Sequence, residues 1–122
     1  MSYVSGFVIP VPEDRKEDYR NMAADAAEMF KGYGAIEIME AWGEDVRDGK
    51  LTDFRRAVQA KPGECIVFSW IIWPDRVTAD AAEKKMGSDE SMAAGNMPFD
   101  MKRMIFGGFS PIFEMGRKGA SQ

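Results

Sequence analysis

The side chains able to do acid–base chemistry in this chain are carboxylates, lysines, tyrosines and one thiol, because the sequence contains no histidine and a single cysteine, Cys65. The lack of histidine excludes a Ser-His-Asp or Cys-His nucleophile and a haem with a proximal histidine, and it argues against a zinc site. Asp53 and Glu40 are the candidate general bases. Arg55 and Arg103 are the candidates for holding an anionic substrate or a developing oxyanion. These catalytic candidates indicate no particular reaction.

The segment 52–56 places a carboxylate, an aromatic ring and two guanidinium groups close together. Two interpretations remain open: an arginine anchors a small acidic or aromatic ligand, or the segment forms a charge network that braces a dimer. The same two interpretations apply to residues 100–103. Aromatic residues elsewhere add to a candidate pocket, although core and interface packing is their commoner use. The ligand-pocket candidates are Trp42, Phe54, Trp70, Phe99 and Asp100.

The sequence predicts no metal site and no cofactor. Acidic residues surround Gly49, but aligning this glycine with the sixth position of a calcium-binding loop places Val46 and Arg55 at ligand positions. A solvated acidic loop is therefore the better interpretation. The ten methionines are more typical of flexible core and interface packing than of soft-metal binding, since neither histidine nor a second cysteine accompanies them.

Composition indicates one cytoplasmic domain. A net charge of −4 argues against a nucleic-acid partner, because phosphate binding needs clustered lysine and arginine. No apolar run is long enough to span a membrane, and no basic region precedes the apolar residues 7–9 as it would in a signal peptide. We expect residues 1–115 to form a single domain and residues 116–122 to form a flexible tail.

Hydrophobic periodicity predicts four strands and two main helices. The strands cover residues 3–9, 35–42, 65–73 and 103–109, and Pro10 and Pro12 are expected to end the first of them. One helix begins near Glu13 and stops at the glycines 32 and 34, and the other begins at Asp75. Residues 52–58 form either a short helix or an irregular segment.

The order of these elements, βαββαβ, predicts an α+β fold of the ferredoxin-like kind, with an antiparallel four-stranded sheet in the order 4-1-3-2. The strands over 3–9 and 65–73 are apolar on both faces, which suits the two central positions. Both helices would cover one face. The other face would expose several large apolar side chains, so we expect a homodimer in which two sheets pack face to face.

Six segments that follow one another along the chain resemble a known family. They read YVSGF (3–7), EAWGEDV (40–46), DGKLTDF (48–54), VFSWI (67–71), KMGSD (85–89) and MPFDMKRMIFGGF (97–109). The family is domain of unknown function 1428, and the resemblance spans residues 3–112. It implies a dimeric α/β-barrel fold and bacterial cytosolic proteins without an assigned activity, so no catalytic residue is carried over. Ala41 stands where members often have cysteine, which argues against a thiol-dependent activity at this position.

Three classes of function remain open from the sequence. The first is a cofactor-independent enzyme that acts on a small aromatic or carboxylic metabolite. The second is a module that binds such a molecule without turnover, and the third is a structural or regulatory dimer. A cavity between sheet and helices with charged groups converging on it would favour the first two.

Overall fold

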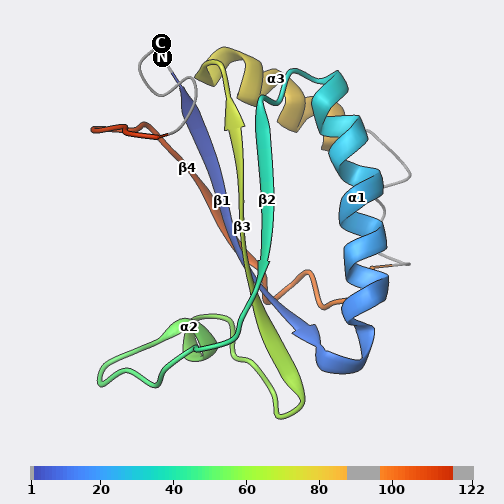
Figure 1. Cartoon of the computed structure of the whole chain (residues 1–122), viewed down its shortest axis with the longest axis vertical. Coiled ribbons are helices and arrows are strands. Elements are labelled where there is room, and N and C mark those ends of the chain that lie inside the picture. The colour runs from blue at the N-terminus through green and yellow to red at the C-terminus, as the bar shows by residue number, and fades with distance from the viewer. Residues whose placement is uncertain (1, 88–96, 117–122) are drawn as a thin grey trace.

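The computed structural model describes residues 2–87 and 97–116. Along the chain these residues form β1 (Tyr3–Pro12), a short 3₁₀ helix (Glu13–Arg15), α1 (Lys16–Gly32), β2 (Glu37–Trp42), α2 (Phe54–Ala57), β3 (Glu64–Trp73), α3 (Arg76–Gly87) and β4 (Ile105–Phe109) (Figure 1). The predicted α+β class is confirmed, and the segment 52–58 contains a helix of one turn, α2. Residues 117–122, most of the predicted tail, lie outside the described residues.

The four strands form one antiparallel sheet in the order β2-β3-β1-β4. The two strands that are apolar on both faces, β1 and β3, are central as predicted. They pair over their full lengths, from Tyr3 opposite Trp73 to Pro12 opposite Glu64. The two edge strands are shorter, and β4 pairs with only half of β1.

The prediction that the first strand ends at Ile9, before Pro10, is wrong, because β1 continues through Pro10 and ends at Pro12. The partner β4 pairs with β1 only from Val4 to Val8, so beyond Val8 one side of β1 has no neighbouring strand. The two prolines are two residues apart and thus present the same side of the strand. A missing N–H on an unpaired side removes no ladder hydrogen bond.

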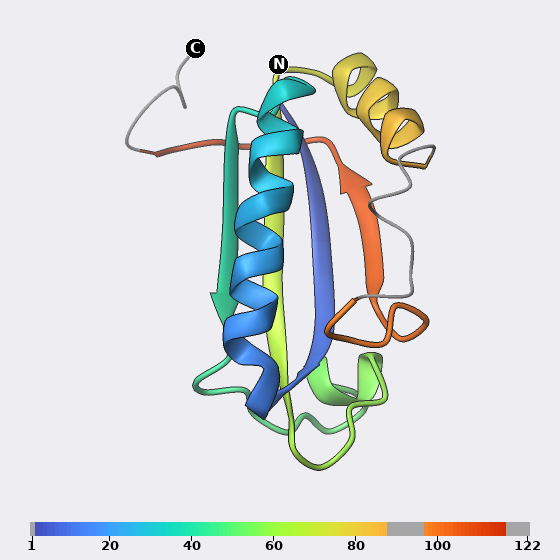
Figure 2. The ribbon, with the colours of Figure 1, turned by 90° about the vertical axis from the view of Figure 1, so that its right-hand side faces the viewer.

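One face of the sheet, which we call the helix face, is covered by α1 and α3 (Figures 1 and 2). Two clusters of buried residues lie there: Ile9, Val11, Tyr19, Ala23 and Val67 in the first, and Ile71, Trp73, Ala79 and Ala82 in the second. Because side chains alternate along a strand, every second residue of β1 and β3 contributes to this core. Gly34, at φ 112°, lets the chain turn after α1 into β2.

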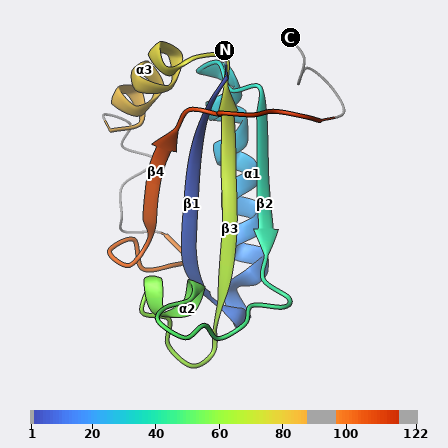
Figure 3. The ribbon, with the colours of Figure 1, turned by 90° about the vertical axis from the view of Figure 1, so that its left-hand side faces the viewer.

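The opposite face, which we call the open face, carries α2 at one end (Figures 1 and 3). It includes exposed apolar side chains: Met39, Phe54, Phe68, Ile105 and Phe109. The prediction that the second face is apolar is therefore confirmed. Among the residues that the structure describes, none of the helices has the length and hydrophobicity needed to cross a membrane.

Candidate functional site

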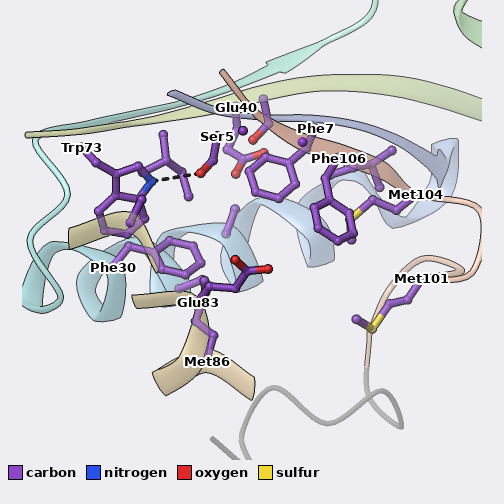
Figure 4. Close-up of a pocket in the computed structure, with 18 of the residues that line it drawn as sticks. Ser5, Phe7, Phe30, Glu40, Trp73, Glu83, Met86, Met101, Met104 and Phe106 are labelled. Atoms are coloured by element: carbon purple, nitrogen blue, oxygen red, sulfur yellow. Dashed lines mark hydrogen bonds between the residues drawn. The ribbon is translucent and has the colours of Figure 1, made fainter. Parts of the chain in front are cut away.

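A cavity of about 680 Å³ lies between the helix face and the two helices α1 and α3 (Figure 4). Its lining is mostly apolar and includes Phe7, Ile9, Met22, Phe30, Ile71, Trp73, Met86, Phe99, Met101, Met104 and Phe106. Alanines at positions 23, 26 and 79 face it from the helices. Their small side chains leave room between layers that larger residues would fill.

One row of residues across the sheet forms a polar part of the floor of this cavity and supplies two of its aromatic rings. The register places Ser69 of β3 opposite both Glu40 of β2 and Phe7 of β1, and Phe7 opposite Phe106 of β4. All four point to the helix face and line the cavity. The alternation of the strands thus brings a carboxyl, a hydroxyl and two aromatic rings side by side.

Glu40 and Tyr19 form the main polar contact of the cavity. The Tyr19 hydroxyl donates to Glu40 Oε1 over 2.7 Å. Burial raises the pKa of Glu40 above its ordinary value, although hydrogen bonds from Tyr19 and the buried Ser69 act in the opposite direction. Burial, reinforced by the charge of Glu40, also raises the pKa of Tyr19, so the phenol remains a neutral donor.

Glu40 also borders a second cavity of about 390 Å³, between α1 and β2. Tyr19 and Glu40 line both cavities, so their hydrogen bond lies where the two spaces adjoin. Trp42 lines the smaller one, with Lys16 Nζ 5.3 Å from its ring centroid. Glu40 is on an edge strand and remains accessible to solvent. Its carboxyl can therefore exchange protons with water while it faces the larger cavity.

The remaining polar groups make the larger cavity electronegative. Glu83 points into it from α3, and Ser5 Oγ accepts a hydrogen bond of 3.0 Å from Trp73 Nε1 (Figure 4). Asp80 is at the border and pairs with Arg76 over 3.5 Å. No lysine or arginine is among the described residues that line this cavity. The lining is therefore unsuited to an anionic ligand.

Asp53 does not line either cavity. It is the N-cap of α2: Oδ1 accepts from the backbone N–H of Arg56 over 2.8 Å, and Oδ2 accepts from that of Gly49 over 3.0 Å. These hydrogen bonds, the one from Arg56 foremost, hold the pKa of Asp53 below its ordinary value. The neighbouring Arg55 donates to the backbone carbonyls of Glu64 (2.7 Å) and Lys61 (3.0 Å).

Arg103 and Asp100 belong to an ion-pair network outside both cavities. Arg103 donates through both terminal nitrogens to the Glu64 carboxylate, each over 2.7 Å, and through Nε to Asp100 Oδ2 over 3.0 Å. These contacts anchor the segment that carries Phe99, Met101 and Met104 to the cavity wall. Of the four catalytic candidates, only Glu40 lines either of these two cavities, and the catalytic roles of the other three stay predictions.

The aromatic pocket candidates are spread over three places. Phe99 lines the larger cavity, with its ring centroid 5.8 Å from that of Tyr19, and Trp42 lines the smaller one. Phe54 and Trp70 lie on the open face, on either side of Phe68, at centroid distances of 6.1 and 5.8 Å.

Sequence reasoning missed the partners of Glu40. Tyr19 is 21 residues away and fits the apolar stripe of its helix, so nothing local marks it as a partner. Ser69 carried a usable signal, because it is the only polar residue within the apolar run 65–73. Ser69 is two residues from the buried Val67 and from the buried Ile71, so its side chain points to the same face as theirs, the helix face.

Comparison with known proteins agrees with the resemblance found in the sequence. The model of a family described as "protein of unknown function (DUF1428)" matches residues 2–101. Relatives named "uncharacterized protein YbaA", from Escherichia coli strain K12 and from Shigella flexneri, are each 54% identical over 116 residues, which is 93% of this chain and 99% of theirs. These names state no activity. The chain therefore belongs to the DUF1428 family of proteins of unknown function.

Proposed function

We propose that this protein is a cofactor-independent enzyme that takes a small, neutral, largely apolar molecule into the larger cavity and exchanges a proton with it through Glu40. The observation that carries this proposal is Glu40 itself: a carboxyl of raised pKa, held by Tyr19, that faces an apolar cavity. Carboxyls in clefts whose pKa is shifted by burial and by a specific partner are candidates for functional sites.

The size and lining of the cavity support a small aromatic ligand. A volume of about 680 Å³ lies within the range of roughly 300–1,000 Å³ that is usual for small-molecule sites. The rings of Phe7, Phe30 and Phe106 offer stacking surfaces. Because the charged groups on the lining are all carboxylates, a neutral substrate with a hydroxyl or carbonyl group suits it better than a carboxylic acid.

Glu40 has the properties required of a general acid or base. Its pKa is raised by burial, and this is the direction that suits such a role, because general acid–base catalysis is most efficient when the pKa lies near the working pH. Tyr19 orients the carboxyl through Oε1. Solvent access at the edge strand provides the route by which the proton lost or gained is replaced.

The proposal extends to the assembly. Strand order β2-β3-β1-β4 within a βαββαβ chain corresponds to the ferredoxin-like arrangement, in which helices occupy one face only. The apolar open face, with Phe68 and Phe109 exposed, favours a homodimer of the dimeric α/β-barrel kind.

The test is a ligand screen with compounds of similar size that differ in charge, such as benzyl alcohol and benzaldehyde against benzoate. Binding is measured by thermal shift, and conversion is followed by NMR over hours. We expect the neutral compounds to bind better than the carboxylate. Glu40→Gln should retain binding of any substrate found and lose conversion, whereas Glu44→Gln, a change of a nearby acidic residue outside both cavities, should retain both.

Three outcomes would contradict the proposal. A consistent preference for carboxylates would contradict the charge argument. Conversion that is unchanged in Glu40→Gln would remove the catalytic role of this residue. Absence of binding across neutral aromatic and aliphatic compounds would contradict the cavity as a ligand site.

A further inference from the structure

Residues 110–116, which we call the C-terminal arm, follow β4 without helix or strand structure. The arm leaves the sheet on the side away from α1 and crosses in front of β1, β3 and β2 (Figures 1 and 3). We infer that this arm docks onto the open face of a second copy of the chain, so that two protomers exchange arms. The inference rests on the proposed homodimer and adds the segment that fastens it.

The arm carries three large apolar side chains that are exposed in the part of the protomer that the structure describes. Ile112, Phe113 and Met115 are 101%, 81% and 86% exposed. Side chains of this kind are stabilised by leaving water, and their exposure shows that they do not pack on the sheet in front of which they pass. The open face is likewise uncovered at Phe68 and Phe109.

The area involved matches what a stable dimer needs. The five apolar side chains of the open face are 40–60% exposed, which amounts to roughly 400 Å² at about 150–200 Å² for a large apolar side chain. The three arm side chains add about 500 Å² on the same basis. The arm thus roughly doubles the apolar area, and the total reaches the ~800 Å² that each partner of a stable complex buries.

The charge of the open face favours a second copy over a charged partner. Only Glu37 and Glu64 are charged among the strand residues that point to this face. Glu64 is buried and paired with Arg103, and Glu37 accepts a hydrogen bond from Trp70 Nε1 over 3.3 Å. The strand part of the open face is thus nearly uncharged, and it can meet its own twofold copy without bringing unpaired like charges together. Because the arm projects from the same side, each arm then reaches the other protomer.

The test compares dimer dissociation constants of full-length proteins by sedimentation velocity. In the arm variant, Ile112, Phe113 and Met115 are replaced by serine. The control is Val77→Ser, which removes an apolar side chain that is 79% exposed on α3, on the other side of the sheet. We expect the arm variant to dissociate at least 10-fold more readily than the wild type and the control to stay within 2-fold. An arm variant as tight as the wild type would overturn the inference.

A second measurement is independent of how the serine variant folds. A photo-cross-linking amino acid at position 113 in the otherwise unchanged chain is activated in a mixture of isotope-labelled and unlabelled protein. Cross-linked peptides that join two copies at open-face residues support arm exchange, and cross-links within one copy alone overturn it. A wild type that stays monomeric at about 100 μM would contradict the homodimer and the arm together. A dimer that is indifferent to the arm would contradict the arm alone.

Discussion

The pairing of Arg103 with Glu64 allows a quantitative test of how the cavity wall is held. The two side chains are 13% and 10% exposed and share two hydrogen bonds of 2.7 Å. Removing one member of a buried ion pair costs about 3–5 kcal/mol, because the other charge is left desolvated without its partner. Both side chains keep some exposure, so we expect Arg103→Met to lower the free energy of unfolding by about 3 kcal/mol, at the lower end of that range.

The effect should depend on pH with a definite sign. The hydrogen bonds from Arg103 hold the pKa of Glu64 below its ordinary value of 4.5. A carboxylate whose pKa is lowered by folding contributes stability that is fully present above its unfolded pKa and is lost as the pH falls through its folded pKa. The difference between wild type and Arg103→Met is therefore expected to be largest near neutrality and to shrink below pH 4.5.

Urea denaturation at one protein concentration, at pH 7 and pH 3, measures this difference. Arg47→Met is the matched control, because Arg47 contacts Asp45 through two nitrogens but the pair is 83% and 71% exposed. Exposed pairs contribute roughly 0–1 kcal/mol. The reasoning is refuted if Arg103→Met loses no more stability than Arg47→Met, or if its loss is the same at both pH values.

Three further outcomes follow from the helix face. Glu40→Gln should be at least as stable as the wild type at pH 7, since a raised carboxyl pKa means that ionisation opposes folding; its advantage should disappear in acid, which denaturation at pH 4 and 7 tests. Tyr19→Phe should raise the pKa of Glu40 further, because it removes a hydrogen bond to the carboxyl, and an NMR titration of the Glu40 side-chain carbon measures this. Gly108→Ala should destabilise the protein by about 1–3 kcal/mol in thermal melts, because an added Cβ would collide with the Tyr3 ring. Gly107→Ala, whose Cβ would lie 3.4 Å from its nearest neighbour, should cost less.

The sequence predicted which strands are central, because the number of apolar faces of a strand can be read from the residues of that strand alone. Alternation and the apolar character of residues 3–9 and 65–73 indicate how many faces of each strand are covered. That information was enough to assign β1 and β3 to the centre. The continuation of β1 through Pro10 to Pro12 was not predictable in this way, since it depends on where β4 stops pairing.

The roles of the charged candidates depended on partners remote in sequence. Asp53 and Arg55 lie close to an aromatic ring in the chain, which is compatible with a ligand site, but the fold uses them to cap α2 and to bind backbone carbonyls. Arg103 is 39 residues from Glu64. Residue types alone do not distinguish a guanidinium that is free to bind a ligand from one that already donates its hydrogen bonds to other groups of the protein.

By itself, the sequence determined the α+β class, the central strands, the apolar second face and the family, because each of these is recorded in local periodicity or in contiguous motifs. Only the tertiary structure decided that Glu40 meets Tyr19 and Ser69 at the wall of a cavity. The physical reason is that a strand's alternation specifies which face a side chain points to, whereas its partner is set by where a helix crosses that face. The position of α1 over β2 is a property of packing between layers, and no stretch of sequence contains it.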